Sequence, residues 1–200
     1  MRWAIRWAMR RAMRRAAVFL LLAVVPLFAS CHGGMHKAGE RMWSVEGFAS
    51  DPVVGDVLWW DGKGDAESGG VGFASRWFVQ DRWALGAAVR PTLFREDGVK
   101  AWGVEVDFNL RWYLWETENL ALFLDGSGGF LWTENPVPAT ATDYNFTFGV
   151  GPGLEIPLGD SFSLLGGIEL HHISNGRGLN VPSNPAQNEI RVWLGFGRTW

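Results

Sequence analysis

Apolar and polar residues alternate with a period of two along most of the chain after residue 40. In the plainest run, residues 104–114, every second residue is apolar, and the residues between are acidic, basic, an amide or Tyr113. Successive side chains of a β-strand point to opposite faces, so this pattern predicts a strand with one apolar and one polar face. No long apolar stripe with the helical period accompanies it, and the pattern therefore predicts an all-β fold.

Eight segments are predicted to form strands, namely residues 42–50, 70–79, 82–95, 100–115, 119–131, 143–157, 161–175 and 187–200. The first is the least regular, because Asp51-Pro52 interrupts it and residues 57–60 could extend or replace it. Most are longer than typical globular strands and match a tilted membrane span. We therefore predict an eight-stranded antiparallel transmembrane β-barrel. A soluble sandwich or barrel, which produces the same alternation, is the alternative.

The aromatic residues support the membrane interpretation. The chain has 13 tryptophans, many near the ends of predicted strands, as in the aromatic girdles of membrane barrels. It also ends in an alternating strand with the terminal aromatic Trp200, which resembles the signal read by the outer-membrane assembly machinery. We predict a location in the outer membrane of a Gram-negative-type bacterium, with outer-membrane lipids and that machinery as partners.

The amino-terminal region is typical of an export signal, because six arginines precede a short apolar run and then small residues. The predicted organisation is a signal peptide over residues 1–30, a periplasmic linker over 31–41 and the barrel over 42–200. Cys31, the only cysteine, follows a segment that resembles a lipoprotein cleavage box, so it is a possible lipidation site. Removing the six arginines would change the formal charge from −3 to −9, which makes nucleic acid an unsuitable partner.

The predicted connections alternate in length, with short turns near residues 80–81, 116–118 and 159–160 and longer ones at 51–69, 132–142 and 176–186. Short turns of outer-membrane barrels lie on the periplasmic side and long loops outside. With a periplasmic amino end, the seventh strand runs outward. Its last residues are then expected at the outer leaflet.

The seventh strand carries the candidate chemistry. His172 and Ser174 are two residues apart, so they share a face with the apolar residues Ile168 and Leu170. A serine becomes a useful nucleophile when a neighbouring base takes its proton. A base and a nucleophile on a lipid-facing surface require either a function or a position at the membrane rim.

The segment from His172 to Asn188, with Asn175-Gly176 after the serine and Pro-containing sequence beyond, resembles the lipid A 3-O-deacylase family of outer-membrane esterases (PagL type, acyloxyacyl hydrolase-like). The motif of that family reads His-x-Ser-Asn-(Ala/Gly), then Pro-Asn, then an acid before the last strand. The resemblance implies hydrolysis of the ester-linked acyl chain at the 3-position of lipid A. It implies Ser174 as nucleophile, His172 as general base and an acid that orients the histidine.

The chain departs from the family pattern at that acid. The expected position is occupied by Asn188, which shares the outward parity of Ile190, whereas Glu189 has inward parity. Three outcomes follow: Asn188 orients the histidine, a bulge turns Glu189 outward as an alternative acid, or activity is reduced or absent. Backbone N–H groups near Asn175 and Gly176, with the Asn175 amide, are the candidate oxyanion site.

No cofactor or metal is expected, because His32 and His36 have no companion ligands in the sequence and are assigned to a solvated linker. The inward-facing charges are expected to fill the lumen as a polar plug. They are Glu46, Arg76, Arg90, Glu105, Asp107, Arg111, Glu169, His171, Glu189 and Arg191. The main alternative to the esterase is a non-catalytic structural or adhesion barrel, and a transport pore is disfavoured by the crowded lumen.

Overall fold

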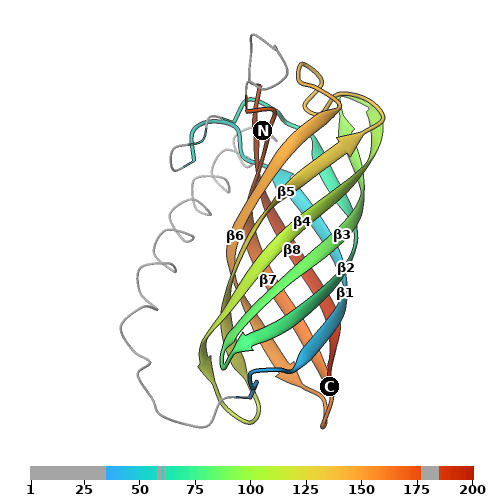
Figure 1. Cartoon of the computed structure of the whole chain (residues 1–200). Helices are drawn as coiled ribbons and strands as arrows, with labels where there is room; N and C mark the ends of the chain where they lie inside the picture. Colours follow the sequence, from blue (N-terminus) through green and yellow to red (C-terminus); the bar gives the residue numbers. More distant parts are fainter. Residues whose placement is uncertain (1–34, 58–59, 61, 177–184) are drawn as a thin grey trace, which may run out of the picture. The chain divides into compact units, whose positions relative to one another are not determined.

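The computed structural model describes residues 35–57, 60, 62–176 and 185–200. Its elements are eight strands: β1 (Arg41–Pro52), β2 (Glu67–Gln80), β3 (Trp83–Glu96), β4 (Val99–Glu116), β5 (Ala121–Thr133), β6 (Tyr144–Pro157), β7 (Phe162–Ser174) and β8 (Gln187–Thr199). Each strand pairs antiparallel with its neighbours in sequence, and β1 pairs with β8 to close a barrel. Figure 1 shows β1 and β8 adjacent along this closing seam.

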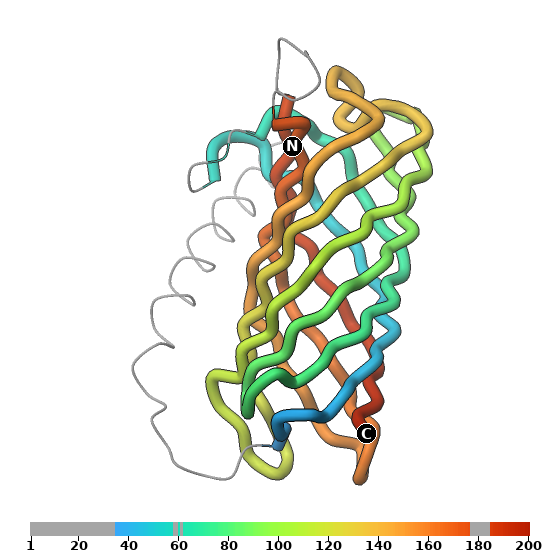
Figure 2. Tube along the Cα trace, in the orientation of Figure 1, coloured from blue at the N-terminus to red at the C-terminus, as the bar shows by residue number. Residues whose placement is uncertain are grey.

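The predicted strands are present, with small differences at their ends. The first strand extends through Pro52 and is not replaced by the following segment, where the isolated bridge between Val57 and Trp60 lies outside the named strands. The fourth strand is the longest, at 18 residues. The tube in Figure 2 shows that the strands cross the barrel obliquely, as closure of a sheet requires.

The distribution of side chains is the reverse of a soluble protein. Large apolar side chains cover the outside, among them Phe108, which is 71% exposed. Charged side chains such as Arg111, Arg191 and Glu105 are buried inside. In a soluble sandwich the apolar faces would meet in a core, so the sandwich alternative is excluded and the transmembrane barrel is confirmed. The described residues contain no helix long and apolar enough to span a membrane.

The lumen is filled by side chains, as predicted. Arg191 contacts Glu105 and Glu169, and Arg90 contacts Asp107. Arg111 is held by two hydrogen bonds from its guanidinium to Asp125, at 2.8 and 2.7 Å. Because opposite charges are paired this closely, the described lumen contains a packed polar network and not an open channel.

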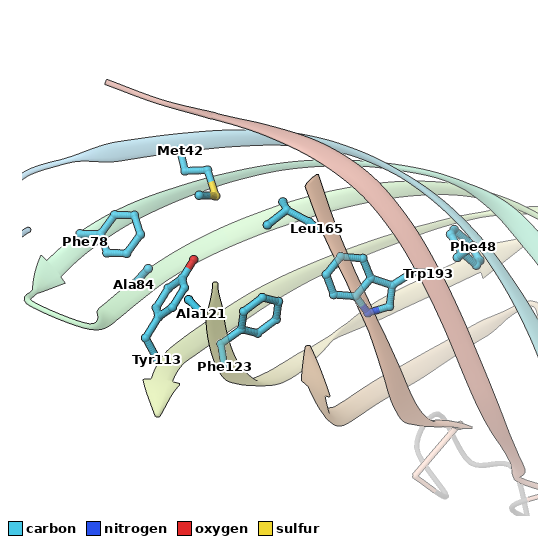
Figure 3. Close-up of a cluster of buried hydrophobic side chains, with 9 residues drawn as sticks. All are labelled: Met42, Phe48, Phe78, Ala84, Tyr113, Ala121, Phe123, Leu165 and Trp193. Carbon is cyan, nitrogen blue, oxygen red and sulfur yellow. The ribbon is translucent and has the colours of Figure 1, made fainter. Parts of the chain in front are cut away.

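An apolar cluster adjoins this polar network inside the barrel (Figure 3). It consists of Met42, Phe48, Phe78, Ala84, Tyr113, Ala121, Phe123, Leu165 and Trp193. Most of these side chains come from the strand ends nearest the short turns, where the first and last strands begin and end. The lumen is therefore apolar toward this end, which the prediction of a purely polar plug did not include.

The segment before β1 corrects one expectation. His36 was assigned to a solvated linker, but it is only 3% exposed and stacks on Phe78, with ring centroids 4.3 Å apart. Its Nε2 lies 3.2 Å from Glu155 Oε2, and that oxygen also accepts a 2.5 Å hydrogen bond from the Tyr113 hydroxyl. His36 is therefore part of the barrel interior, where the aromatic contacts and the Glu155 carboxylate offset part of the cost of burying its ring.

The two ends of the barrel differ. Short turns at residues 81–82, 117–120 and 158–161 lie at the same end as the start of β1 and the carboxyl terminus (Figure 1). The connection of residues 134–143 and the described residues of the connections after β1 and β7 lie at the opposite end. One connection at that end is short, because Asp97-Gly98 adopts positive φ at both positions and makes a two-residue hairpin. We call the end with the longer connections the loop end.

Candidate functional site

The candidate residues come together where β7 and β8 reach the loop end. The register between these strands is continuous from Phe162 to Ile173, and it pairs His172 directly with Asn188. His172 is on the outer face of the barrel with the exposed Ile168, as the alternation predicted. Asn188 is fully buried, and His172 and Ser174 are each 8% exposed. The site is therefore on the outer surface and yet covered.

The cover is a loop that joins β1 to β2. We use the name capping loop for its described residues, 53–57, 60 and 62–66. It follows the start of β8: the Val53 N–H donates to the Asn188 carbonyl at 2.7 Å, and the Lys63 and Gly64 N–H groups donate to the Ala186 carbonyl at 2.7 and 3.1 Å. These backbone hydrogen bonds fix the loop against the strand that carries Asn188.

Asn188 connects the histidine to this loop. Its Nδ2 donates to the Gly55 carbonyl at 3.2 Å and to the Trp60 carbonyl at 3.1 Å. Carbonyls only accept, so these contacts assign the amide nitrogen to the loop side and leave Oδ1 facing His172. Oδ1 lies 2.8 Å from His172 Nδ1. Because an amide oxygen cannot donate, Nδ1 carries the proton, and Nε2 keeps the lone pair of a base.

Trp60 covers the ring of the histidine. The two rings are stacked, with centroids 5.0 Å apart and an interplanar angle of 15°. Trp60 also contacts Phe148, the cross-strand neighbour of His172 on β6, at 4.9 Å. The sequence suggested Trp60 only as one of many interfacial tryptophans. Its role at the site was missed, and the sequence spacing of more than 100 residues carries no signal for it.

Ser174 lies two residues beyond His172 on the same face and pairs across strands with Phe146. Residues two apart in a strand are separated by about 6.6 Å along the chain direction, a gap that a histidine and a serine side chain together span. Among the contacts of the described residues, no hydrogen bond joins the two side chains. A general base often approaches its nucleophile fully only when substrate is bound.

Glu189 does not reach this site. It lies inside the barrel, where it contacts His171 Nδ1 at 3.0 Å and accepts a 2.8 Å hydrogen bond from the Ser68 hydroxyl. The pairing of β7 with β8 has no bulge that could reverse its direction. The prediction that Glu189 might serve as an alternative acid for His172 is therefore wrong, because the pleat directs its side chain into the lumen.

The candidate oxyanion residues directly follow β7. Asn175 is buried, and Gly176 is exposed and adopts a φ of +61°, in the left-handed region that favours glycine. Residues 177–184, which contain the rest of the family motif, lie outside the described residues, as do Cys31 and the predicted signal peptide. In the part of the chain that the structure describes, no group of three or more potential metal ligands is found.

Comparison with known proteins supports the fold. No protein-family model and no curated protein matches the chain. Among solved structures, the outer membrane protein OprG from Pseudomonas aeruginosa is 12% identical, with a TM-score of 0.51 over 84% of this chain and 98% of that one. Ail, the attachment invasion locus protein of Yersinia pestis, is also 12% identical, with a TM-score of 0.46 over 82% and 99%.

The outer membrane protein AlkL is 13% identical, with a TM-score of 0.46 over 88% of this chain and 96% of that one. Identities this low speak to the fold alone. The closed barrel, its apolar exterior and the likeness to OprG together define the chain as an eight-stranded β-barrel of the outer-membrane type.

Proposed function

We propose that this protein is an outer-membrane serine esterase that removes the ester-linked 3-O acyl chain of lipid A. One observation carries the proposal: His172 on the outer face donates its Nδ1 proton to Asn188, which leaves Nε2 as a base on the strand face that Ser174 shares two residues later. A histidine held in one tautomer by a neighbouring side chain, with a hydroxyl close by, is the arrangement that activates serine nucleophiles.

In this mechanism Nε2 of His172 removes the proton from the Ser174 hydroxyl as its oxygen attacks the ester carbonyl carbon. The resulting tetrahedral oxyanion accepts hydrogen bonds from N–H groups at Asn175 and Gly176. When the intermediate collapses, the imidazolium gives its proton to the departing sugar oxygen and the acyl group stays on Ser174. Water, activated by the same histidine, then releases the fatty acid and restores the serine.

Asn188 orients the imidazole throughout, but its neutral amide cannot stabilise the imidazolium by charge. In the Cys-His-Asn arrangement of other hydrolases an asparagine has the same role. We therefore expect slower turnover than in an esterase whose loop and histidine are arranged around a carboxylate.

The surroundings of the site suit a lipid substrate. Phe146 and Phe148 on β6 are exposed apolar side chains that pair across strands with Ser174 and His172, and the exposed Ile168 lies further along the same face of β7. An acyl chain embedded in the outer leaflet would contact these residues without leaving its hydrocarbon surroundings. We place the site at the outer leaflet because the loop end lies opposite the chain terminus and the short turns.

The test is mass spectrometry of lipid A from cells that express the wild-type chain or Ser174→Ala. Loss of one 3-hydroxyacyl mass with the wild type alone is the expected result. Heat-modifiable electrophoretic migration and surface labelling check that both barrels are folded and inserted. Identical lipid A from both strains, with both barrels folded, would contradict the esterase and favour the non-catalytic structural or adhesion barrel.

A further inference from the structure

The capping loop and Asn188 fit each other in a way that a carboxylate at position 188 would not. Both N–H groups of the Asn188 amide are used, one on the Gly55 carbonyl and one on the Trp60 carbonyl. An aspartate has no N–H group, so an ionised oxygen would face two carbonyl oxygens at the same 3.1 to 3.2 Å. Three acceptors without a donor repel one another, and the loop would lose its contacts with this side chain.

A glycine in the loop makes this close approach possible. A Cβ atom built on Gly62 would lie 2.5 Å from Asn188 Nδ2 and 2.9 Å from its Cγ. Atoms at these separations overlap, so any larger residue at position 62 would displace either the loop or the amide. The loop backbone therefore fits the amide of Asn188 in two ways. The Gly55 and Trp60 carbonyls accept its N–H groups, and Gly62 has no side chain that would collide with it.

The same loop also reaches the base directly. The Trp60 carbonyl holds Asn188, and the Trp60 ring stacks on His172. One residue thus contacts both the histidine and the side chain that orients it. The contacts run from the loop through the amide to Nδ1 of the imidazole, and they leave its Nε2 unused by Asn188.

We infer that the capping loop is a positioning element matched to an amide, so that this chain uses Asn188 because of its loop and not as a weakened copy of an acid. Gly55, Trp60 and Gly62 are positioning residues, since they act on the base through Asn188 or by covering it. This inference rests on the proposed esterase function for its catalytic consequence. The fit between loop and amide stands on the contacts themselves.

Asn188→Asp is the first test, because it replaces one N–H-bearing group with an oxygen of nearly the same size. Aspartate still accepts the proton of His172 Nδ1 and adds a negative charge, so a site that needs only an orienter would gain activity. If the loop requires the amide, hydrogen–deuterium exchange at residues 53–57 rises about tenfold as its contacts with the side chain are lost. Lipid A deacylation falls by a similar factor.

Gly62→Ala tests the same fit with Asn188 unchanged. The added methyl group is expected to raise exchange in the capping loop and lower deacylation, as Asn188→Asp does. Gly126→Ala is the matched control, since a Cβ at that position meets no atom within 4 Å. It should leave both measurements at the wild-type level. Heat-modifiable migration reports whether each variant has folded, and Gly62→Ala alone suffices if Asn188→Asp does not fold.

The outcomes separate this inference from the proposed function. Wild-type exchange in both Asn188→Asp and Gly62→Ala, or activity of Asn188→Asp at or above wild type, would overturn the positioning role. If the wild-type chain leaves lipid A intact, the esterase proposal fails, while the exchange measurements still decide whether the loop recognises the amide. Faster exchange in both variants, with Gly126→Ala unchanged, supports the inference in either case.

Discussion

His171 and His172 are neighbours in the chain and lie on opposite sides of the barrel wall. His171 is fully buried in the lumen, with Nδ1 3.0 Å from Glu189 and Nε2 3.1 Å from Glu105. His172 faces outward and has an amide at Nδ1 and an indole over its ring. Adjacent residues of a strand point to opposite faces, so His171 lies between two carboxylates and His172 contacts a neutral amide. The amide occupies only Nδ1 of His172.

The difference separates a histidine of the lumen network from the histidine that we propose as the catalytic base. Both nitrogens of His171 are used by carboxylates, so that ring has no lone pair to offer a substrate. His172 has Nδ1 fixed by Asn188, and Nε2 is the nitrogen that the proposed mechanism uses for proton transfer. The register that pairs His171 with Glu189 also pairs His172 with Asn188. A single alignment of β7 with β8 therefore gives each histidine its partner.

The largest predicted effect comes from removing the outer ring. His172→Ala should lower lipid A deacylation by about a thousandfold or more, because the serine loses its base. The measurement is the rate of acyl release from lipid A in detergent micelles. The midpoint of urea unfolding should stay close to wild type, since the lumen contacts are intact. Substantial remaining activity would contradict the assignment of His172 as the base.

Removing the inner ring, that of His171, should lower the stability of the barrel more than its activity. His171→Ala leaves Glu105 and Glu189 without a shared partner in the lumen, which is expected to lower the free energy of unfolding by about 3–5 kcal/mol. Urea titration of the reconstituted barrel measures the change. Activity below the unfolding transition should fall far less than in His172→Ala. An unchanged stability would show that the lumen network does not depend on this ring.

A smaller effect is expected from Glu189→Gln, which keeps the shape of the side chain and removes its charge. Glu189 contacts His171 and Ser68, so weakening these contacts should lower the free energy of unfolding by about 1–3 kcal/mol. Deacylation should remain near wild type because Glu189 does not contact His172. A loss of activity as large as that of His172→Ala, without unfolding, would return Glu189 to the candidate site.

The smallest predicted effect concerns the cover over the outer ring. Trp60→Ala removes a stacked contact worth about 0.5–1.5 kcal/mol, so carbethoxylation of His172 by diethyl pyrocarbonate should accelerate by roughly tenfold at most. Mass spectrometry of the labelled peptide measures it. Trp102→Ala is the control, since that exposed tryptophan lies away from the site on β4. Equal labelling rates in the two variants would mean that Trp60 does not shield the histidine.

The fold was predictable because alternation has a direct physical cause in the membrane. Along the membrane span most outward positions face lipid and many inward ones face polar groups, so the alternation from Val104 to Leu114 predicts the strand and its two faces directly. The pairing of His172 with Asn188 could be anticipated from the same parity. Parity also indicated that Glu189 points inward, and the structure agrees with it.

Two features were beyond the reach of sequence patterns. The capping loop holds Asn188 through the carbonyls of Gly55 and Trp60, and backbone acceptors have no residue-type signature. His36 enters the lumen from a segment with no periodic pattern, held by Phe78 and Glu155 from distant strands. Both depend on contacts across more than 100 residues or between separate strands, which only the folded chain brings together.

The pairing of β1 with β8 has a consequence for the chain before the barrel is closed and inserted in the membrane. The capping loop leaves the end of β1, and Asn188 lies at the start of β8, so these parts meet only when the first and last strands pair. In a chain whose seam is open, β7 can still pair His172 with Asn188, but the loop contacts that fix the amide and the Trp60 indole over His172 are absent. Closure of the barrel is therefore the step that completes the cover of the site, and the proposed hydrolase is expected to have its full arrangement only after that step.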